Sequence, residues 1–295
     1  MLRLTICTAA LLANLLVCRQ ALAADITFAR SCTRPEQGTD GKVRSDCDIQ
    51  LTGVITSGDS RKLEELMRRP LKEGQAFRWL QLDSPGGEVR EAIRMAQTVR
   101  QTLLQTMNLR VHQGERSKCL SACFLVWVAG ANRHQLGETT SRGTYGIGLH
   151  RPYFSKEFYS ANAASVADAH QSLNEYVRTF LRRENVPEDL IDKMLSRSSR
   201  EIYWLHDAGD PYKLSGDAGW YQEMRIAECQ YDPRMAEKLD QEADIERTRR
   251  RSKGLPVDWP TPPGPKLRAW IEWQLQQDQC EHDLRLRAQT AFRKR

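Results

Sequence analysis

The stretch that decides the fold is AFRWLQLDSPGGEVREAIRMAQTVRQTLLQ, residues 76–105. Its opening segment AFRWLQLD is mostly apolar and predicts a buried strand, which the turn formers SPGG end. From residue 88 onward, apolar residues recur at intervals of three and four, which predicts a helix that begins directly after the turn. The stretch therefore predicts one strand-to-helix unit of an α/β protein.

The same alternation continues on both sides of this unit. The other predicted strands are ADITFAR (24–30), CDIQLTGVIT (47–56), LRVHQGE (109–115) and TYGIGLH (144–150), the other predicted helices span residues 60–74, 160–183 and 187–197, and residues 129–143 are predicted to form a turn. Strands that alternate with helices favour an α/β core over an all-α or an all-β domain.

The character of the chain changes after about residue 225. Residues 233–253 carry charges on most faces of a helical pattern, GLPVDWPTPPGP is a proline-rich connector, and residues 266–295 predict one more helix. Trp270 and Trp273 in that helix are available for packing. We therefore expect residues 24–224 to form the α/β domain and residues 225–295 to form an appended C-terminal helical arm.

The first 23 residues have the pattern of a secretory signal. Arg3 supplies the positive start, LTICTAALLANLLV is apolar, and Ala21-Leu22-Ala23 is a small-x-small cleavage site. The alternative is a lipid anchor at Cys18. No later segment reaches about 18 uninterrupted apolar residues, so no membrane span is expected in the mature chain. The prediction is a periplasmic or secreted protein.

Composition excludes two further classes of partner. The formal net charge of +6 is too small to indicate nucleic-acid binding, and the basic run RTRRRSKG at 247–254 is typical of a solvated helix end. The chain contains no CxxC pair and no HExxH motif, so no metal site and no cofactor are predicted.

The cysteines favour disulfides. Eight are present, and those that lie beyond the signal are Cys32, Cys47, Cys119, Cys123, Cys229 and Cys280. An even number in an exported chain indicates disulfides rather than metal ligands. The first two flank a short polar segment and are expected to pair, and the last two would tie the C-terminal extension back on itself.

Cys119 and Cys123 raise a separate question, because they lie on either side of Ser121. A bridge between residues four apart at a helix start requires a distorted first turn. If it forms, it would staple this loop and place it under redox control. If it does not form, the two are small buried residues.

Ser121 itself lies ahead of the apolar run ACFLVWVAGA, which predicts a buried helix. A serine in this position commonly caps the helix. The start of a buried helix also carries unpaired N–H groups, which stabilise a developing oxyanion, so the same geometry suits a nucleophile. A hydroxyl needs a base within hydrogen-bond reach. His150, which ends the segment GIGLH beside Pro152, has the most suitable setting among the histidines.

Three motifs in this order resemble a known family. Asp-Ser-Pro-Gly-Gly at 83–87, Ser-Ala at 121–122 and His150-x-Pro are similar to the serine peptidases of the Clp proteolytic-subunit family, within the Clp/crotonase superfamily. The similarity covers roughly residues 50–220. It implies a spiral of β-β-α units with the active site in a cleft.

The resemblance also implies roles for single residues. Ser121 matches the nucleophile, His150 the general base, and the N–H groups of Gly87 and Ala122 the oxyanion hole. Glu201 matches the acidic third member best by its offset from Leu205. Asp207 and Asp210 are the alternatives for that acid.

These residues predict an exported serine hydrolase that cleaves peptides or unfolded protein segments. The chain contains no Walker motif, so we expect a peptidase that acts without ATP. Assembly into a homo-oligomer stays open. The first alternative is a non-catalytic peptide-binding or scaffold protein that keeps the cleft. The second is a crotonase-like acyl-thioester enzyme, which ranks last because export removes it from coenzyme A.

Overall fold

The computed structural model describes most of the chain and confirms a mixed α/β fold. The described residues are 23–28, 32–38, 40–108, 117–135, 138–140, 143–154, 158, 165–205, 214–253 and 264–295. The predictions for the signal up to residue 22, for the strand LRVHQGE and for most of the proline-rich connector lie outside these residues.

The main sheet has a parallel centre. Its strands, in the order β1-β3-β4-β5-β7-β11 with β2 beside β3, are β1 (Asp25–Phe28), β2 (Glu36–Gln37), β3 (Val43–Thr52), β4 (Gln75–Asp83), β5 (Gln105–Asn108), β7 (Asn132–His134) and β11 (Gly216–Asp217). β3, β4, β5 and β7 pair in parallel, and β1 and β11 pair antiparallel at the edges. In β3, Cys47, Ile49 and Leu51 are fully buried and their neighbours are half-buried, which is the period of two expected of a strand.

A second, smaller sheet carries the segments next to Ser121 and His150. Its strands are β6 (Lys118–Leu120), β8 (Glu138–Thr140), β9 (Gly143–Leu149) and β10 (Tyr203–Trp204). β6 and β9 are parallel, and β10 runs antiparallel to β9. Single bridges join Ile55 to Gly87 and Ser84 to Cys119. The turn at Gly86 and Gly87, called the glycine turn below, is therefore next to this sheet.

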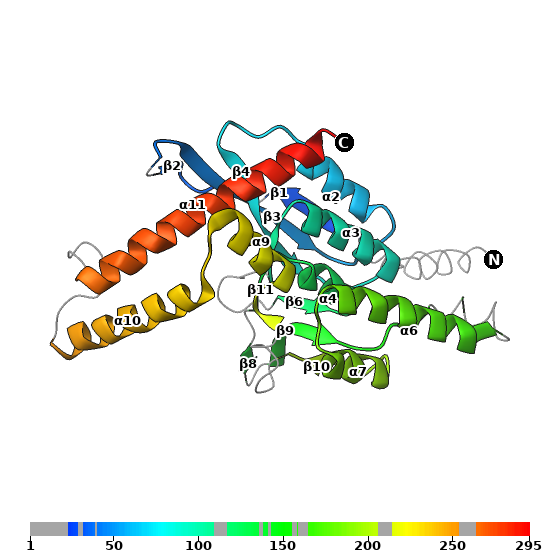
Figure 1. Cartoon of the computed structure of the whole chain (residues 1–295). Coiled ribbons are helices and arrows are strands. Elements are labelled where there is room, and N and C mark those ends of the chain that lie inside the picture. The colour runs from blue at the N-terminus through cyan, green and yellow to red at the C-terminus, as the bar shows by residue number, and fades with distance from the viewer. Residues whose placement is uncertain are drawn as a thin grey trace, which may run out of the picture.

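Helices make up much of the rest of the described chain. They are α2 (Asp59–Met67), α3 (Val89–Gln101), α4 (Ala122–Val128), α6 (Val166–Arg183), α7 (Glu188–Ser196), α9 (Gly219–Cys229), α10 (Pro233–Ser252) and α11 (Pro265–Arg293). α3 packs between α2 and α4 (Figure 1). Every residue of α4 is buried, so the helix that follows Ser121 lies in the centre of the core.

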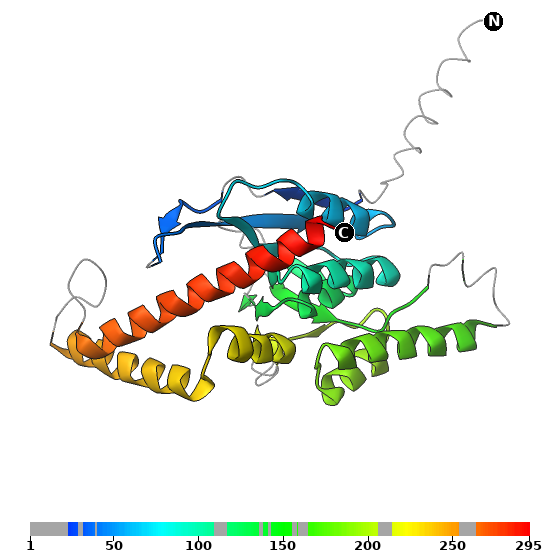
Figure 2. The ribbon, with the colours of Figure 1, turned by 45° about the horizontal axis from the view of Figure 1, so that its top comes forward.

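The C-terminal extension both projects from the α/β body and returns to it. α10 and α11 pack side by side and extend away from the body (Figure 2). The last turns of α11 contact β4, α2 and α3, and Phe292 belongs to the same apolar core as Leu80 and Phe77. The end of the predicted arm is therefore part of the α/β domain.

Charged side chains of α11 hold Asp46 on β3. His282 Nδ1 lies 2.9 Å from Asp46 Oδ1, and His282 Nε2 lies 3.1 Å from the Gly74 carbonyl oxygen. Burial alone would raise the pKa of Asp46, but the hydrogen bond from His282 and the charges of Arg285 and Arg78 outweigh it and hold this pKa well below its ordinary value.

Gln289 provides the most buried polar contact of α11, and its removal tests how the extension is fixed. Its side chain is fully buried, accepts the Phe77 N–H at 2.9 Å and donates to the Phe77 and Thr102 carbonyl oxygens at 2.7 and 3.2 Å. Gln289→Leu leaves these backbone groups unpaired, which we expect to lower the free energy of unfolding by about 2–4 kcal/mol. Urea denaturation measures this loss. The exposed Gln276→Leu is the control, and an equal effect of both changes would contradict the assignment.

The two predicted disulfides are confirmed, and the bridge that the sequence left open also forms. Cys32 pairs with Cys47, Cys119 with Cys123, and Cys229 with Cys280. Disulfides of this number fit a protein of an oxidising compartment. None of the helices in the described ranges combines the length and apolar character that a bilayer crossing requires.

Candidate active site

Ser121 forms the sharp turn between β6 and α4. Its backbone has φ 54° and ψ −122°, and its hydroxyl caps no backbone amide of the helix. The capping role that is usual for a serine at this position is therefore not used here. A residue other than glycine with such a φ costs about 1–3 kcal/mol, and such residues concentrate at functional sites. The hydroxyl thus stands at a strained turn with no structural hydrogen bond among the described residues.

The strand register brings Ser121 and His150 to the same end of the second sheet. Leu120 lies opposite Gly148 in the parallel β6–β9 pair, and the Ser121 N–H donates to the Gly148 carbonyl oxygen at 3.0 Å. Neighbouring strands lie about 4.8 Å apart, and His150 is two residues beyond Gly148. Both residues belong to the described chain, and no hydrogen bond joins the hydroxyl to the ring. In an unliganded enzyme that contact is often long and tightens with substrate.

The His150 ring is held in place by a backbone contact. The residue is buried, and its Nδ1 lies 2.9 Å from the carbonyl oxygen of Arg151. A carbonyl oxygen only accepts, so Nδ1 is the nitrogen that donates in this contact, and no hydrogen bond to the described residues uses Nε2. The ring of Tyr153 packs at 5.7 Å between centroids, which limits how far the imidazole can turn.

The glycine turn lies directly against the serine turn. Gly86 has φ 96°, and a Cβ atom on it would lie 2.7 Å from the Ser121 Cβ and 3.0 Å from the Ala122 nitrogen. Gly87 has φ 147°, and a Cβ there would lie 2.0 Å from the Ile55 carbonyl oxygen. Only glycine fits at both positions. The absence of two side chains is therefore what lets the two turns meet.

Two amide N–H groups at this meeting point donate to none of the residues that the structure describes. The Gly86 carbonyl oxygen accepts from Ile55 N–H at 2.8 Å, and Glu88 N–H donates to the Ile55 carbonyl oxygen at 2.9 Å. Gly87 lies between Gly86 and Glu88 in the chain, and its N–H donates to none of the described residues. The N–H of Ala122 likewise donates to none of them. Unpaired donors next to a serine hydroxyl are the components of an oxyanion site.

Two neighbours with clear structural roles were not predicted from the sequence. Ser84 is buried, and its Oγ accepts the Gly86 N–H at 3.1 Å. Asp83 Oδ1 accepts the Lys118 N–H at 3.0 Å. These contacts hold the glycine turn on β6. The pattern Asp-Ser-Pro gives a signal for the Ser84 contact, because Ser side chains commonly bond to the backbone two residues on. The Asp83 contact reaches a distant segment and has no such local signal.

Glu201, the acid implied by the resemblance, is engaged elsewhere. Its side chain is exposed, and its Oε2 accepts the Ser198 N–H at 3.2 Å. Glu201 and His150 are both described, and no hydrogen bond joins them. The alternatives Asp207 and Asp210 lie outside the described residues. Of the groups described, the Arg151 carbonyl oxygen is the one that orients the imidazole.

We expect Glu201→Gln to leave activity nearly intact. Because the carboxylate does not reach His150, turnover of an unfolded substrate should change by less than about threefold, whereas loss of a true orienting carboxylate lowers kcat by about 10⁴-fold. Steady-state kinetics on purified variants measure the difference. Asp207→Asn and Asp210→Asn in the same assay identify any acid that does contribute. A loss of several orders of magnitude in Glu201→Gln would overturn this placement.

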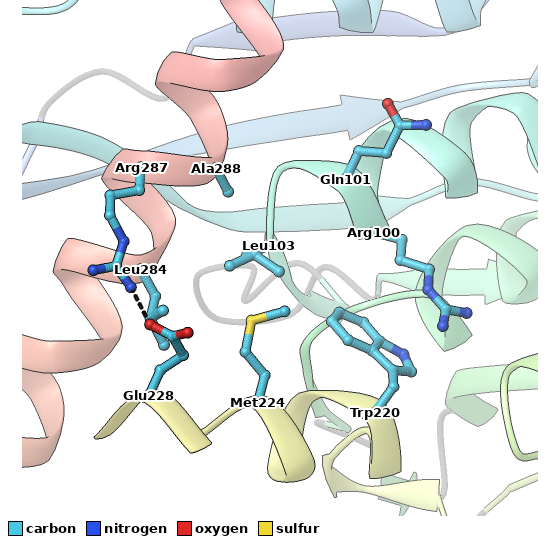
Figure 3. A pocket seen from close by; sticks show the side chains of 9 residues that line it. All are labelled: Arg100, Gln101, Leu103, Trp220, Met224, Glu228, Leu284, Arg287 and Ala288. Atoms are coloured by element: carbon cyan, nitrogen blue, oxygen red, sulfur yellow. Dashed lines mark hydrogen bonds and ion pairs between the residues drawn. The ribbon is translucent and has the colours of Figure 1, made fainter. Parts of the chain in front are cut away.

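One cavity of about 640 Å³ lies away from these residues, where α9 and α11 meet the end of α3. Leu103, Met224 and Leu284 form its apolar lining, and Arg287 is paired with Glu228 at its rim (Figure 3). No residue of the candidate site lines it. The cavity therefore belongs to the junction between the extension and the core.

Comparison with known proteins adds no assignment. No protein-family model matches the chain, and no curated protein matches it. The functional argument therefore depends on the residues and their geometry.

Proposed function

We propose that the protein is an exported serine hydrolase of peptides that acts without ATP. The observation that carries the proposal is the β6–β9 register, which brings Ser121, at a strained turn, and His150 to the same end of the second sheet. The N–H groups of Gly87 and Ala122, which donate to none of the described residues, lie at the two turns beside Ser121. In this reaction Ser121 Oγ attacks the substrate carbonyl, and His150 takes the proton and passes it to the leaving amine. The two amides stabilise the oxyanion, and water then hydrolyses the acyl-enzyme.

The chain topology supports a Clp-type spiral for this proposal. β4 is followed by the bridge at Ser84 in the second sheet and then by α3, and β5 is followed by β6 and α4. Each of these units adds one strand to the main sheet, one segment to the second sheet and one helix. In the proposed spiral, the nucleophile and the glycine turn belong to neighbouring units.

Peptides and unfolded segments are the proposed substrates. The three motifs resemble those of a peptidase family, and a Ser/His pair with an oxyanion site is suited to acyl transfer. The predicted signal and the disulfides favour action outside the cytoplasm, where no ATP supply feeds an unfoldase. A folded substrate is therefore expected to resist cleavage.

Turnover and binding assays with the same peptides test the proposal. Casein-derived peptides should be cleaved by the wild-type protein, with product fragments identified by mass spectrometry. Calorimetric binding of the same peptides without any cleavage would reject the hydrolase and favour the peptide-binding scaffold. If the peptides were neither bound nor cleaved, both the hydrolase and the peptide-binding scaffold would be rejected.

A further inference from the structure

The Cys119–Cys123 disulfide encloses the three residues that contain the nucleophile and one proposed oxyanion donor. Cys119 lies on β6 and Cys123 lies in the first turn of α4, with a Cα–Cα distance of 5.1 Å. A fully extended chain would separate residues four apart by about 13 Å. The bridge therefore requires the chain to turn within this loop, and Ser121, with φ 54°, lies at that turn.

The conformation of Ser121 is unusual for its location. Among the described residues, the non-glycine positions with positive φ are Leu103, Ser121, Asn185 and Gln230. All except Ser121 follow the last turn of a helix, where a left-handed residue is a common way to end the helix. Ser121 instead precedes a helix, so no ordinary helix-ending geometry accounts for its φ. Something else in the surroundings must hold it.

The Cys119–Cys123 disulfide is located where it can hold the Ser121 backbone at its positive φ. Both sulfur-bearing side chains are fully buried, and Cys119 is fixed opposite Ile147 in the β6–β9 pair. Chain-entropy stabilisation by a disulfide grows with the length of the closed loop, and this bridge spans 4 residues against 15 and 51 for the other two. General stability is therefore the weakest explanation for it.

We infer that the Cys119–Cys123 disulfide is the positioning element of the candidate site. It holds Ser121 in its strained conformation and keeps the Ala122 N–H directed beside the glycine turn. This inference rests on the proposed function. It adds that the site becomes competent only after export, when the two thiols are oxidised and two electrons and two protons pass to a protein or small-molecule disulfide oxidant. Once folded, the buried bridge is shielded from reductants.

The test compares two disulfide deletions in the full-length oxidised protein. We expect Cys119→Ser/Cys123→Ser to lower kcat, and the rate of labelling by a fluorophosphonate probe, about 100-fold, which is the effect of a displacement near 1 Å, with KM changed less than about threefold. The matched control is Cys229→Ser/Cys280→Ser, which should lose more thermal stability and keep its labelling rate. Labelling of the first variant within about threefold of wild type would overturn the inference.

Two further measurements keep the inference separable from the proposed function. Wild-type protein refolded from the fully reduced state should recover labelling with oxidised glutathione and not with reduced glutathione. Hydrogen–deuterium exchange across residues 118–128 should be at least about tenfold faster in the Cys119→Ser/Cys123→Ser variant, because the turn is released. A wild-type protein that does not react with the probe would reject the proposed hydrolase. Independently of that result, an exchange rate across residues 118–128 that is the same in the variant and in the wild type would reject the positioning role of the disulfide.

Discussion

Ser121→Ala should abolish both probe labelling and peptide turnover. The hydroxyl is the only group that this change removes, and removal of a nucleophile lowers kcat by at least about a thousandfold. The fold should be retained, because the hydroxyl makes no hydrogen bond to any described residue. Labelling with a fluorophosphonate probe, followed by peptide mass spectrometry, measures the effect and locates the adduct.

The matched control is Ser196→Ala, which removes an exposed hydroxyl at the end of α7. It should label at the wild-type rate. Equal labelling of wild type and Ser121→Ala would remove the nucleophile assignment, whatever the turnover assay gives.

Gly86→Ala should damage stability and activity together. A Cβ atom at this position would lie 2.6 Å from the Leu120 carbonyl oxygen and 2.7 Å from the Ser121 Cβ. The backbone at φ 96° is also unfavourable for alanine. We expect a loss of about 2–4 kcal/mol in the free energy of unfolding. Activity should fall about 100-fold or more, because the glycine turn and the serine turn are forced apart.

Gly41→Ala separates the effect of an unfavourable backbone conformation from the effect of a steric clash between the two turns. Gly41 has φ 78° in the turn between β2 and β3, and a Cβ atom there meets nothing within 4 Å. It should cost about 1–2 kcal/mol through the backbone alone and leave activity unchanged. Urea denaturation and the peptide assay on both variants give the comparison. If Gly86→Ala kept full activity, the contact between the two turns would not matter for function.

Much of the fold could be predicted from local pattern. AFRWLQLD corresponds to β4 and TYGIGLH to β9, and the helix after SPGG begins at Val89. These segments have a strong apolar period and clear turn residues, so local sequence is enough to define them. The pairing of Cys32 with Cys47 and of Cys229 with Cys280 was also accessible, whereas the bridge between Cys119 and Cys123 was left open because it depends on the conformation of the turn between them.

Other elements could not be predicted because their cause is not local. Residues 129–143 were expected to form a turn, yet they contain β7 and β8. Strands of three residues show no period, and β7 forms because β5 offers a parallel partner. The helix predicted to reach residue 105 ends at Gln101, since Leu103 takes φ 53° and Leu104 leads into β5.

The atomic contacts of the candidate site are also only partly predictable from local sequence. The spacing of motifs indicated Ser121, His150 and the glycine turn, since each depends on residue type. The orientation of His150 by the Arg151 carbonyl oxygen depends on a backbone atom that every residue has. The burial of Gln289 likewise follows from the path of α11, because a glutamine on a charged helix gives no signal of it.

A crystal structure of the wild-type protein with a peptide boronic acid would test the central claim most directly. The account predicts a covalent bond from Ser121 Oγ to boron, His150 Nε2 within hydrogen-bond distance, and one boronate oxygen accepting from both the Gly87 and Ala122 N–H groups. A boronate bound to another residue, or an oxygen directed away from both amides, would contradict it.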